Sequence, residues 1–145
     1  MASSITWYDH SWKLITTGGI DLDTDTLKLA LVTSSYTPNV AHTVWDPGTN
    51  DAADPSYNEV ATGAGYTTGG VVIATPVVTN STIDYTDPVW TSLTKTFRYA
   101  VCYVDKVVGS LTDPLLFYIL LDTTPANIVS SGSNYTIQWL SLIHI

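Results

Sequence analysis

In its second half the chain reads Lys95-Thr96-Phe97-Arg98-Tyr99-Ala100-Val101-Cys102-Tyr103-Val104-Asp105. Successive side chains of a strand point to opposite faces, so one face of this stretch carries Phe97, Tyr99, Val101 and Tyr103. After Arg98 the other face is apolar as well, up to Val104. A strand that is apolar on both faces is typical of a central position with further layers on each side. We therefore expect residues 96–104 to form a strand in the middle of a sheet.

Other stretches have strand character and define the rest of the expected core. Residues 26–33 place Leu27, Leu29 and Leu31 on one face, residues 115–121 are apolar on both faces, and residues 135–139 alternate. Shorter strands are expected at 71–75 and 89–91, with a hairpin around Asn80-Ser81. The sequence predicts a turn over 106–114 and a loop over 123–133. The apolar end, residues 142–145, is expected to pair with another strand.

A short helix is expected near the N-terminus, from about residue 9 to residue 16. Asp9 is a suitable cap, and Gly18-Gly19 would end the helix. Many short strands, regular turns and one helix predict an all-β protein, with residues 1–145 as a single-domain β-sandwich. The sandwich would carry the short N-terminal helix and one long loop.

The composition excludes several classes of function. Charged residues make up 12% of the chain and the formal net charge is −8, so the basic surface that nucleic-acid binding requires is not expected. The longest apolar run, residues 115–121, is too short to span a bilayer, and the start of the sequence does not resemble a secretion signal. Cys102 is the only cysteine, and we interpret it as a buried core residue. A low charge with many Trp and Tyr is more typical of a surface that meets other proteins.

The long turn-rich stretch from residue 37 to residue 58 is a candidate docking loop. It contains Asp46-Pro47-Gly48 and Asp54-Pro55-Ser56, both typical turn sequences. Loops of this length in a compact domain are usually functional or packed on something. Trp45 and Tyr57 are the predicted anchors on a neighbouring subunit, because large aromatic residues dominate binding energy at interfaces. The alternative is that Trp45 covers the core of its own domain.

The glycine-rich stretch at residues 63–70 surrounds Tyr66, which is a third candidate for partner binding. The pattern lacks the third glycine of a dinucleotide-binding fingerprint and the lysine of a phosphate-binding loop. We interpret the glycines as positions where the backbone adopts a positive φ or approaches another segment closely.

Residues for catalysis or metal binding are sparse. His10, His42 and His144 occur without a nucleophile elbow and without the local His and Cys pairs of a zinc site. Asp21, Asp23 and Asp25 resemble the start of a calcium loop, but Thr26 stands where that loop requires glycine and Val32 where it requires an acidic residue. They are a weak candidate for a cation site, and a solvated turn is the simpler interpretation. We expect no catalytic residues and no cofactor.

Two stretches carry a resemblance to a known family. One is residues 19–33, followed by Tyr36-Thr37-Pro38 and His42; the other is Glu59-Val60 followed by Gly63-Ala64-Gly65-Tyr66-Thr67-Thr68-Gly69-Gly70. The strand through Arg98, Tyr99, Ala100 and Tyr103 and the ending Ile137-Gln138-Trp139 fit the same pattern. The chain resembles a family of small virion structural proteins of tailed bacteriophages, over most of its length.

The resemblance implies a structural role without enzymatic activity. The expected function is decoration of the capsid, as a cement protein on the outer surface of the head, made in the cytoplasm of the host bacterium. The expected partners are the major capsid protein and neighbouring copies of this chain, with a homo-oligomer possible and without nucleic acid or membrane. The first alternative is a tail or spike component that binds the host surface or a carbohydrate. A virion-associated hydrolase is the second, and the sequence offers no constellation for it.

Overall fold

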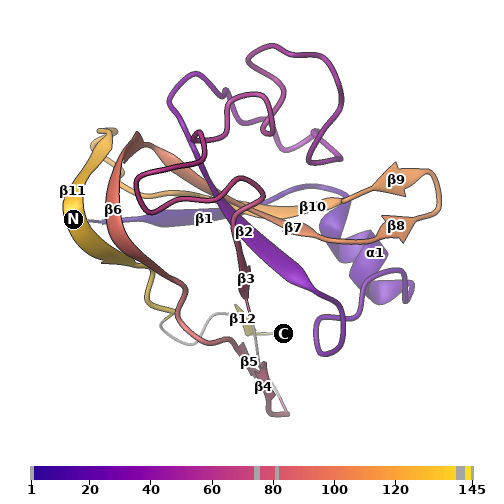
Figure 1. The fold of residues 1–145 in the computed structure, drawn as a ribbon. Helices are drawn as coiled ribbons and strands as arrows, with labels where there is room; N and C mark the ends of the chain where they lie inside the picture. Colours follow the sequence, from indigo (N-terminus) through magenta and orange to yellow (C-terminus); the bar gives the residue numbers. More distant parts are fainter. Residues whose placement is uncertain (1, 74–75, 81, 140–142, 145) are drawn as a thin grey trace.

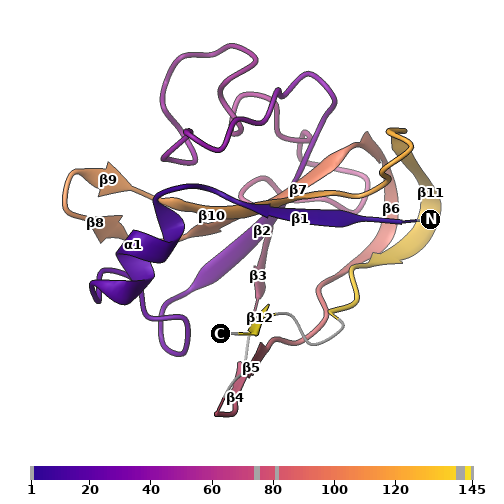
Figure 2. The same cartoon turned by 180° about the vertical axis from the view of Figure 1, so that it is seen from behind.

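The predicted central strand lies at the centre of an antiparallel sheet in the computed structural model, which describes residues 2–73, 76–80, 82–139 and 143–144. Within these residues the sheet has five strands in the order β1-β10-β7-β2-β3 (Figures 1 and 2). The strands are β1 (Ser4–Trp7), β10 (Leu115–Leu120), β7 (Tyr99–Val104), β2 (Leu27–Val32) and β3 (Val71–Ile73). The apolar pattern of β7 therefore predicted its place correctly, with two strands on each side.

The prediction of one continuous strand over residues 96–104 is wrong. The chain forms β6 (Val89–Phe97) and then β7, and it changes sheets at Arg98. Arg98 connects β6 to β7. Its backbone N–H donates to Val32 O at 2.9 Å, and its carbonyl oxygen accepts from Leu121 N at 3.2 Å. The side chain of Phe97 consequently packs on the same face as Ala100 and Cys102, opposite to that of Val101 and Tyr103.

A second β layer covers one face of the five-stranded sheet. It consists of β6 paired with β11 (Ile128–Thr136), and of the small sheet β12-β5-β4. The small sheet contains β4 (Val77–Val78), β5 (Thr82–Asp84) and β12 (Ile143–His144). The core between the layers holds Leu27, Leu29, Leu31, Phe97, Cys102, Leu116, Trp90 and Trp139 among others. Because helix accounts for 4% of the chain, the predicted all-β class is confirmed.

The long loop covers the opposite face of the same sheet (Figure 1). A second core cluster lies there, formed by Tyr8, Ala30, Val32, Tyr36, Trp45, Val101, Tyr103 and Leu115. Alternate residues of β7 therefore enter two different cores, which is the physical reason for its apolar pattern on both faces.

The remaining elements both confirm and correct the sequence analysis. The helix α1 (Ser11–Thr16) lies within the predicted residues 9–16, but the prediction of Asp9 as its cap is wrong, because His10 occupies the N-cap position and its side chain makes no capping hydrogen bond. The β4–β5 hairpin lies where it was predicted, and β12 pairs with β5 as expected for the chain end. Residues 81, 142 and 145 of these two predictions lie outside the described residues. The predicted turn contains the hairpin of β8 (Val107–Val108) and β9 (Leu111–Thr112), and β1 was not predicted. The predicted 123–133 loop is confirmed for residues 123–127 and wrong beyond them, because β11 starts at Ile128. The predicted 135–139 strand ends at Thr136. Residues 74–75 of the expected 71–75 strand lie outside the described residues.

Candidate functional site

Trp45, one of the predicted anchors, belongs to the core of its own domain. Its side chain is 7% exposed and its ring stacks on Tyr103, with centroids 4.7 Å apart and an interplanar angle of 11°. The backbone N–H of Trp45 donates to Asp113 O at 2.9 Å, so the loop is fixed to the sheet at this point. The alternative interpretation of Trp45 therefore holds in this structure, and its role as an exposed anchor is corrected.

Of the three candidates for partner binding, Tyr57 is the one that points to solvent, with 61% of its surface exposed. The turn that presents it is built on Asp54, whose buried carboxylate accepts hydrogen bonds from Asn50 N, Ser56 Oγ and Tyr57 N at 2.8 to 3.1 Å. Asn58 completes the turn by donating its side-chain amide to the carbonyl oxygens of Asp51 and Asp54. The predicted docking loop is thus ordered by its own polar residues.

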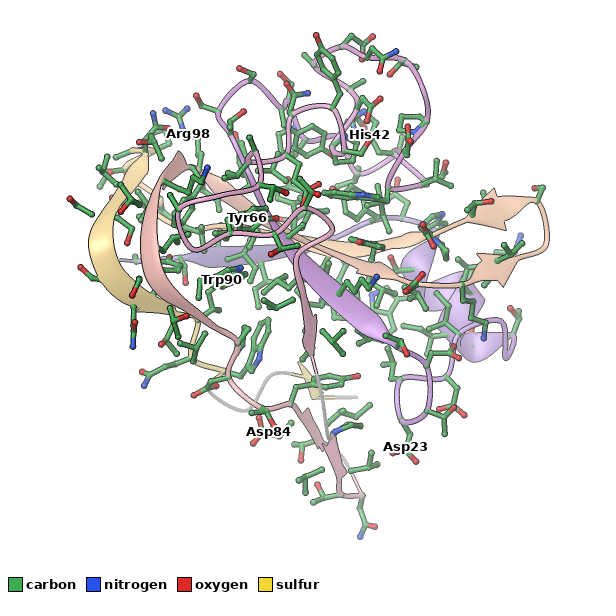
Figure 3. The ribbon with its side chains drawn as sticks, in the orientation of Figure 1. Asp23, His42, Tyr66, Asp84, Trp90 and Arg98 are labelled. Carbon is green, nitrogen blue, oxygen red and sulfur yellow. The ribbon has the colours of Figure 1, made fainter. Side chains whose placement is uncertain are left out.

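Tyr66, the third partner-binding candidate, is 2% exposed and acts within the fold (Figure 3). Its hydroxyl accepts a hydrogen bond from Leu31 N at 3.0 Å and donates to Glu59 Oε1 at 2.6 Å. Glu59 also accepts from Gly69 N at 2.6 Å. Burial raises the pKa of the Glu59 carboxyl above its ordinary value, while these two hydrogen bonds act in the opposite direction. The prediction that Tyr66 binds a partner is corrected, because its hydroxyl completes the hydrogen bonding of β2.

The glycines of the same stretch allow two close backbone contacts. A Cβ at Gly70 would lie 2.1 Å from Leu29 O, and one at Gly65 would lie 2.6 Å from Thr91 O. Both glycines have positive φ angles, 78° and 88°. The glycine motif that carries the family resemblance therefore lies against β2 directly before β3 begins at Val71, and the structural interpretation of the glycines is confirmed.

The three aspartates do not converge on a cation site. Asp25 Oδ2 accepts from Lys106 Nζ at 2.7 Å and from Asp21 N at 2.8 Å, and Asp21 Oδ1 accepts from Asp23 N at 3.0 Å. Burial alone would raise the pKa of Asp25, but these hydrogen bonds and the Lys106 charge lower it below its ordinary value. Among the described residues no group of three His, Cys, Asp or Glu side chains could hold a metal ion. The weak calcium candidate is corrected to an ordered turn before β2.

Two histidines contribute to the packing around the five-stranded sheet. His10 Nε2 lies 2.7 Å from Leu115 O, and His42 Nδ1 lies 2.9 Å from the hydroxyl of Tyr36, which in turn contacts that of Tyr8 at 2.9 Å. Burial lowers the pKa of His42 below its ordinary value. The backbone of His144 pairs with Thr82. His10 and His42 thus make separate hydrogen bonds within the fold.

Three exposed valines that the sequence analysis missed lie on β3 and β4, and we call them the valine arm (Val72, Val77 and Val78). These side chains are 53%, 63% and 50% exposed. The strands are the outermost ones of their sheets, and the β4–β5 hairpin projects from the body of the molecule (Figure 1). Residues 60–83 contain no charged residue, although exposed edge strands are normally protected by charges. That charge-free run is the sequence signal that could have revealed the surface.

Comparison with known proteins leaves the family open. No family model, no curated protein and no solved structure matches this chain. The similarity to bacteriophage structural proteins rests on the sequence motifs described above and stays a prediction. No helix in the described part of the chain is long and apolar enough to cross a membrane.

Proposed function

We propose that this chain is a non-enzymatic structural protein of a bacteriophage virion. In this proposal it decorates the outside of the head and stabilises the lattice of the major capsid protein. The observation that carries the proposal is the valine arm, three exposed apolar side chains on two edge strands, two of them on a projecting hairpin. Exposed apolar surface of this kind marks contact with other proteins. The all-β fold and its two ordered cores provide a rigid support for such a contact.

The energetic argument for a cement protein is mass action. A protein that binds the assembled lattice and not the free subunits shifts the equilibrium toward the assembled state. Because a lattice repeats, many copies that each bind weakly stabilise it together. A copy that contacts two subunits at once binds more tightly, because its second contact forms at a high effective concentration. A small domain with an apolar arm meets both requirements without any catalytic group.

The experiment uses virions produced without this protein. They should assemble but release DNA at a lower temperature than complete virions, and adding back the purified chain should restore the higher temperature. Val77→Lys should weaken the restoration, because it places a charge in the proposed contact. Val129→Lys is the matched control, because Val129 is 71% exposed on β11 and lies outside the arm. Equal heat resistance with and without the protein would contradict the proposal.

A second candidate function is host binding by a tail or spike component. Trp12 is 39% exposed, and its ring lies 4.7 Å from that of Trp7 with a tilt of 35°. Partly exposed aromatic rings of this kind offer a flat apolar surface to a sugar. In the experiment above, virions that keep their heat resistance but no longer adsorb to cells would favour this candidate.

A further inference from the structure

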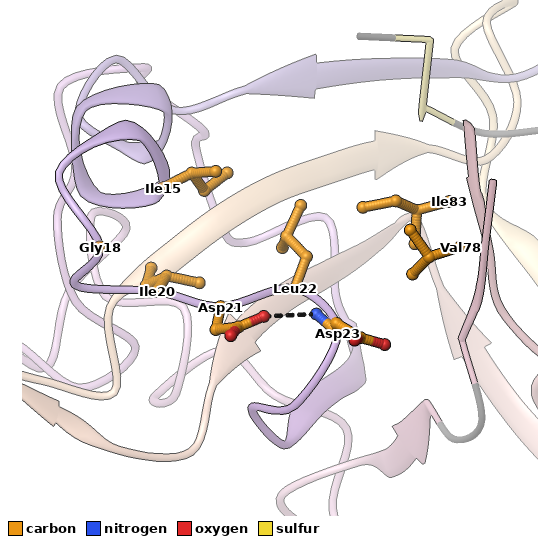
Figure 4. Close-up of a pocket in the computed structure, with 8 residues that line it drawn as sticks. All are labelled: Ile15, Gly18, Ile20, Asp21, Leu22, Asp23, Val78 and Ile83. Atoms are coloured by element: carbon orange, nitrogen blue, oxygen red, sulfur yellow. Dashed lines mark hydrogen bonds between the residues drawn. The ribbon is translucent and has the colours of Figure 1, made fainter. Parts of the chain in front are cut away.

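A groove separates the β4–β5 hairpin from the segment that connects α1 to β2. Its volume is about 320 Å³, and its apolar lining consists of Ile15, Ile20, Leu22, Val78 and Ile83. The side chains of Leu22, Val78 and Ile83 approach one another from the two walls (Figure 4). The wall on the α1 side is fixed, because the buried hydroxyl of Tyr85 donates to Leu22 O at 2.8 Å. The groove thus has an apolar interior, and this hydrogen bond connects its two sides.

The rim of the groove is acidic. Asp21 and Asp23 line it and are both exposed, whereas the neighbouring Asp25 is neutralised by Lys106 at 2.7 Å. Figure 3 shows Asp23 on one side and Asp84 on the hairpin on the other. No ion pair of Asp21 or Asp23 occurs among the described residues. Two unpaired carboxylates next to an apolar space favour an occupant that is apolar and positively charged.

We infer that this groove binds a segment of a protein partner that inserts one aliphatic side chain and places a Lys or Arg against Asp21 and Asp23. The inference rests on the proposed function, because the coat protein of the lattice would supply the segment. Charge disfavours a second copy as the occupant, since the net charge is −8 and the five basic residues are scattered. Pro76 directly precedes β4, the edge strand of the small sheet, and has no backbone N–H to donate to an added strand, so side-chain insertion is favoured over addition of a strand.

The first test needs no virion. The isolated protein is titrated with the peptide acetyl-Gly-Lys-Leu-Lys-Gly-amide while the methyl resonances of Leu22, Val78 and Ile83 are followed by NMR. We expect these resonances to shift in a saturable manner, and the binding to weaken at high salt because exposed charges are screened. The peptides with Glu in place of Lys, or with Ser in place of Leu, should bind more weakly. Equal shifts with all three peptides, or no shifts, would overturn the inference.

Two variants separate the apolar and the charged parts of the site. Val78→Lys should abolish the peptide-induced shifts, and the fold should survive because Val78 is 50% exposed. The double variant Asp21→Asn with Asp23→Asn keeps the side-chain acceptor of Asp21 and should weaken binding by roughly three- to tenfold, as expected for two exposed ion pairs. Asp46→Asn is the matched control on an exposed turn of the long loop and should bind like the unmodified chain.

Binding of the same variants to virions that lack the protein distinguishes the possible failures. If the unmodified chain binds the peptide in the groove but does not bind the particles, the proposed function fails and the groove inference stands. If the double variant Asp21→Asn with Asp23→Asn binds the particles as tightly as the unmodified chain, the groove inference fails and the proposed function stands, because neither residue belongs to the valine arm. A dimer of the unmodified chain in solution that Val78→Lys abolishes would overturn the inference in favour of a second copy as the occupant.

Discussion

Removing the hydroxyl of Tyr66 tests whether the glycine motif is structural. In Tyr66→Phe the buried N–H of Leu31 loses its acceptor at 3.0 Å, and Glu59 keeps Gly69 as a donor but loses the phenol at 2.6 Å. An unsatisfied buried donor costs about 1–3 kcal/mol, so we expect a loss of about 2–3 kcal/mol of unfolding free energy. For a domain of this size, urea denaturation followed by Trp fluorescence should show a midpoint lower by about 1 M or more.

The matched control is Tyr57→Phe, which removes the same hydroxyl from a ring that is 61% exposed. It should change the unfolding free energy by less than about 0.5 kcal/mol, as usual for surface substitutions. A double-mutant cycle of Tyr66→Phe and Glu59→Gln should give a coupling of at least about 0.5 kcal/mol, since the two side chains share a hydrogen bond. A loss for Tyr66→Phe as small as that for Tyr57→Phe would refute the reasoning.

Further predictions concern a close backbone contact, a core tryptophan and two buried titratable groups. Gly70→Ala should lower the free energy of unfolding by more than about 3 kcal/mol or prevent folding. Gly48→Ala should lower it by about 1 kcal/mol, because Gly48 also has a positive φ but nothing lies within 4 Å of the added Cβ. The difference between the two variants in equilibrium unfolding measures the backbone clash at Gly70. Trp45→Ala should destabilise the free protein by about 3–5 kcal/mol in urea denaturation, because it empties a stacked position in the core. Glu59 has a raised pKa in the folded state. The stability of the unmodified chain relative to Glu59→Gln should therefore be highest below the ordinary glutamate pKa and should fall as the pH rises through the folded pKa. Unfolding curves from pH 4 to pH 7 measure this difference. Burial raises the pKa of the Cys102 thiol, so a thiol reagent should react with the native protein only as fast as the protein unfolds, and rapid reaction in native buffer would contradict its burial.

The fold class followed from the sequence because strand patterns are local. The alternation in residues 27–31 and the apolar run at residues 115–121 each report a strand and the faces it buries. The break at Arg98 could not be predicted, because Phe97 and Tyr99 are both aromatic and preserve the alternating pattern across the change of sheet. That break depends on pairing with β11, which is distant in the sequence.

The candidate site was less predictable for the same physical reason. Trp45 and Tyr66 are large aromatic residues in turn-rich segments, and such residues serve a binding surface or a core depending on what lies beneath them. The exposure of Val77 and Val78 depends on the hairpin projecting from the body, which no local pattern encodes. The absence of charge from residue 60 to residue 83 was visible in the sequence and is the signal that points to this surface.

The most direct test of a role in capsid decoration is a reconstruction of the virion at a resolution that locates this chain. The proposed function predicts many copies at regular positions on the outer surface of the head, with the valine arm and the adjacent groove facing the major capsid protein. A few copies confined to the tail or its spikes, or a head without this chain, would contradict it.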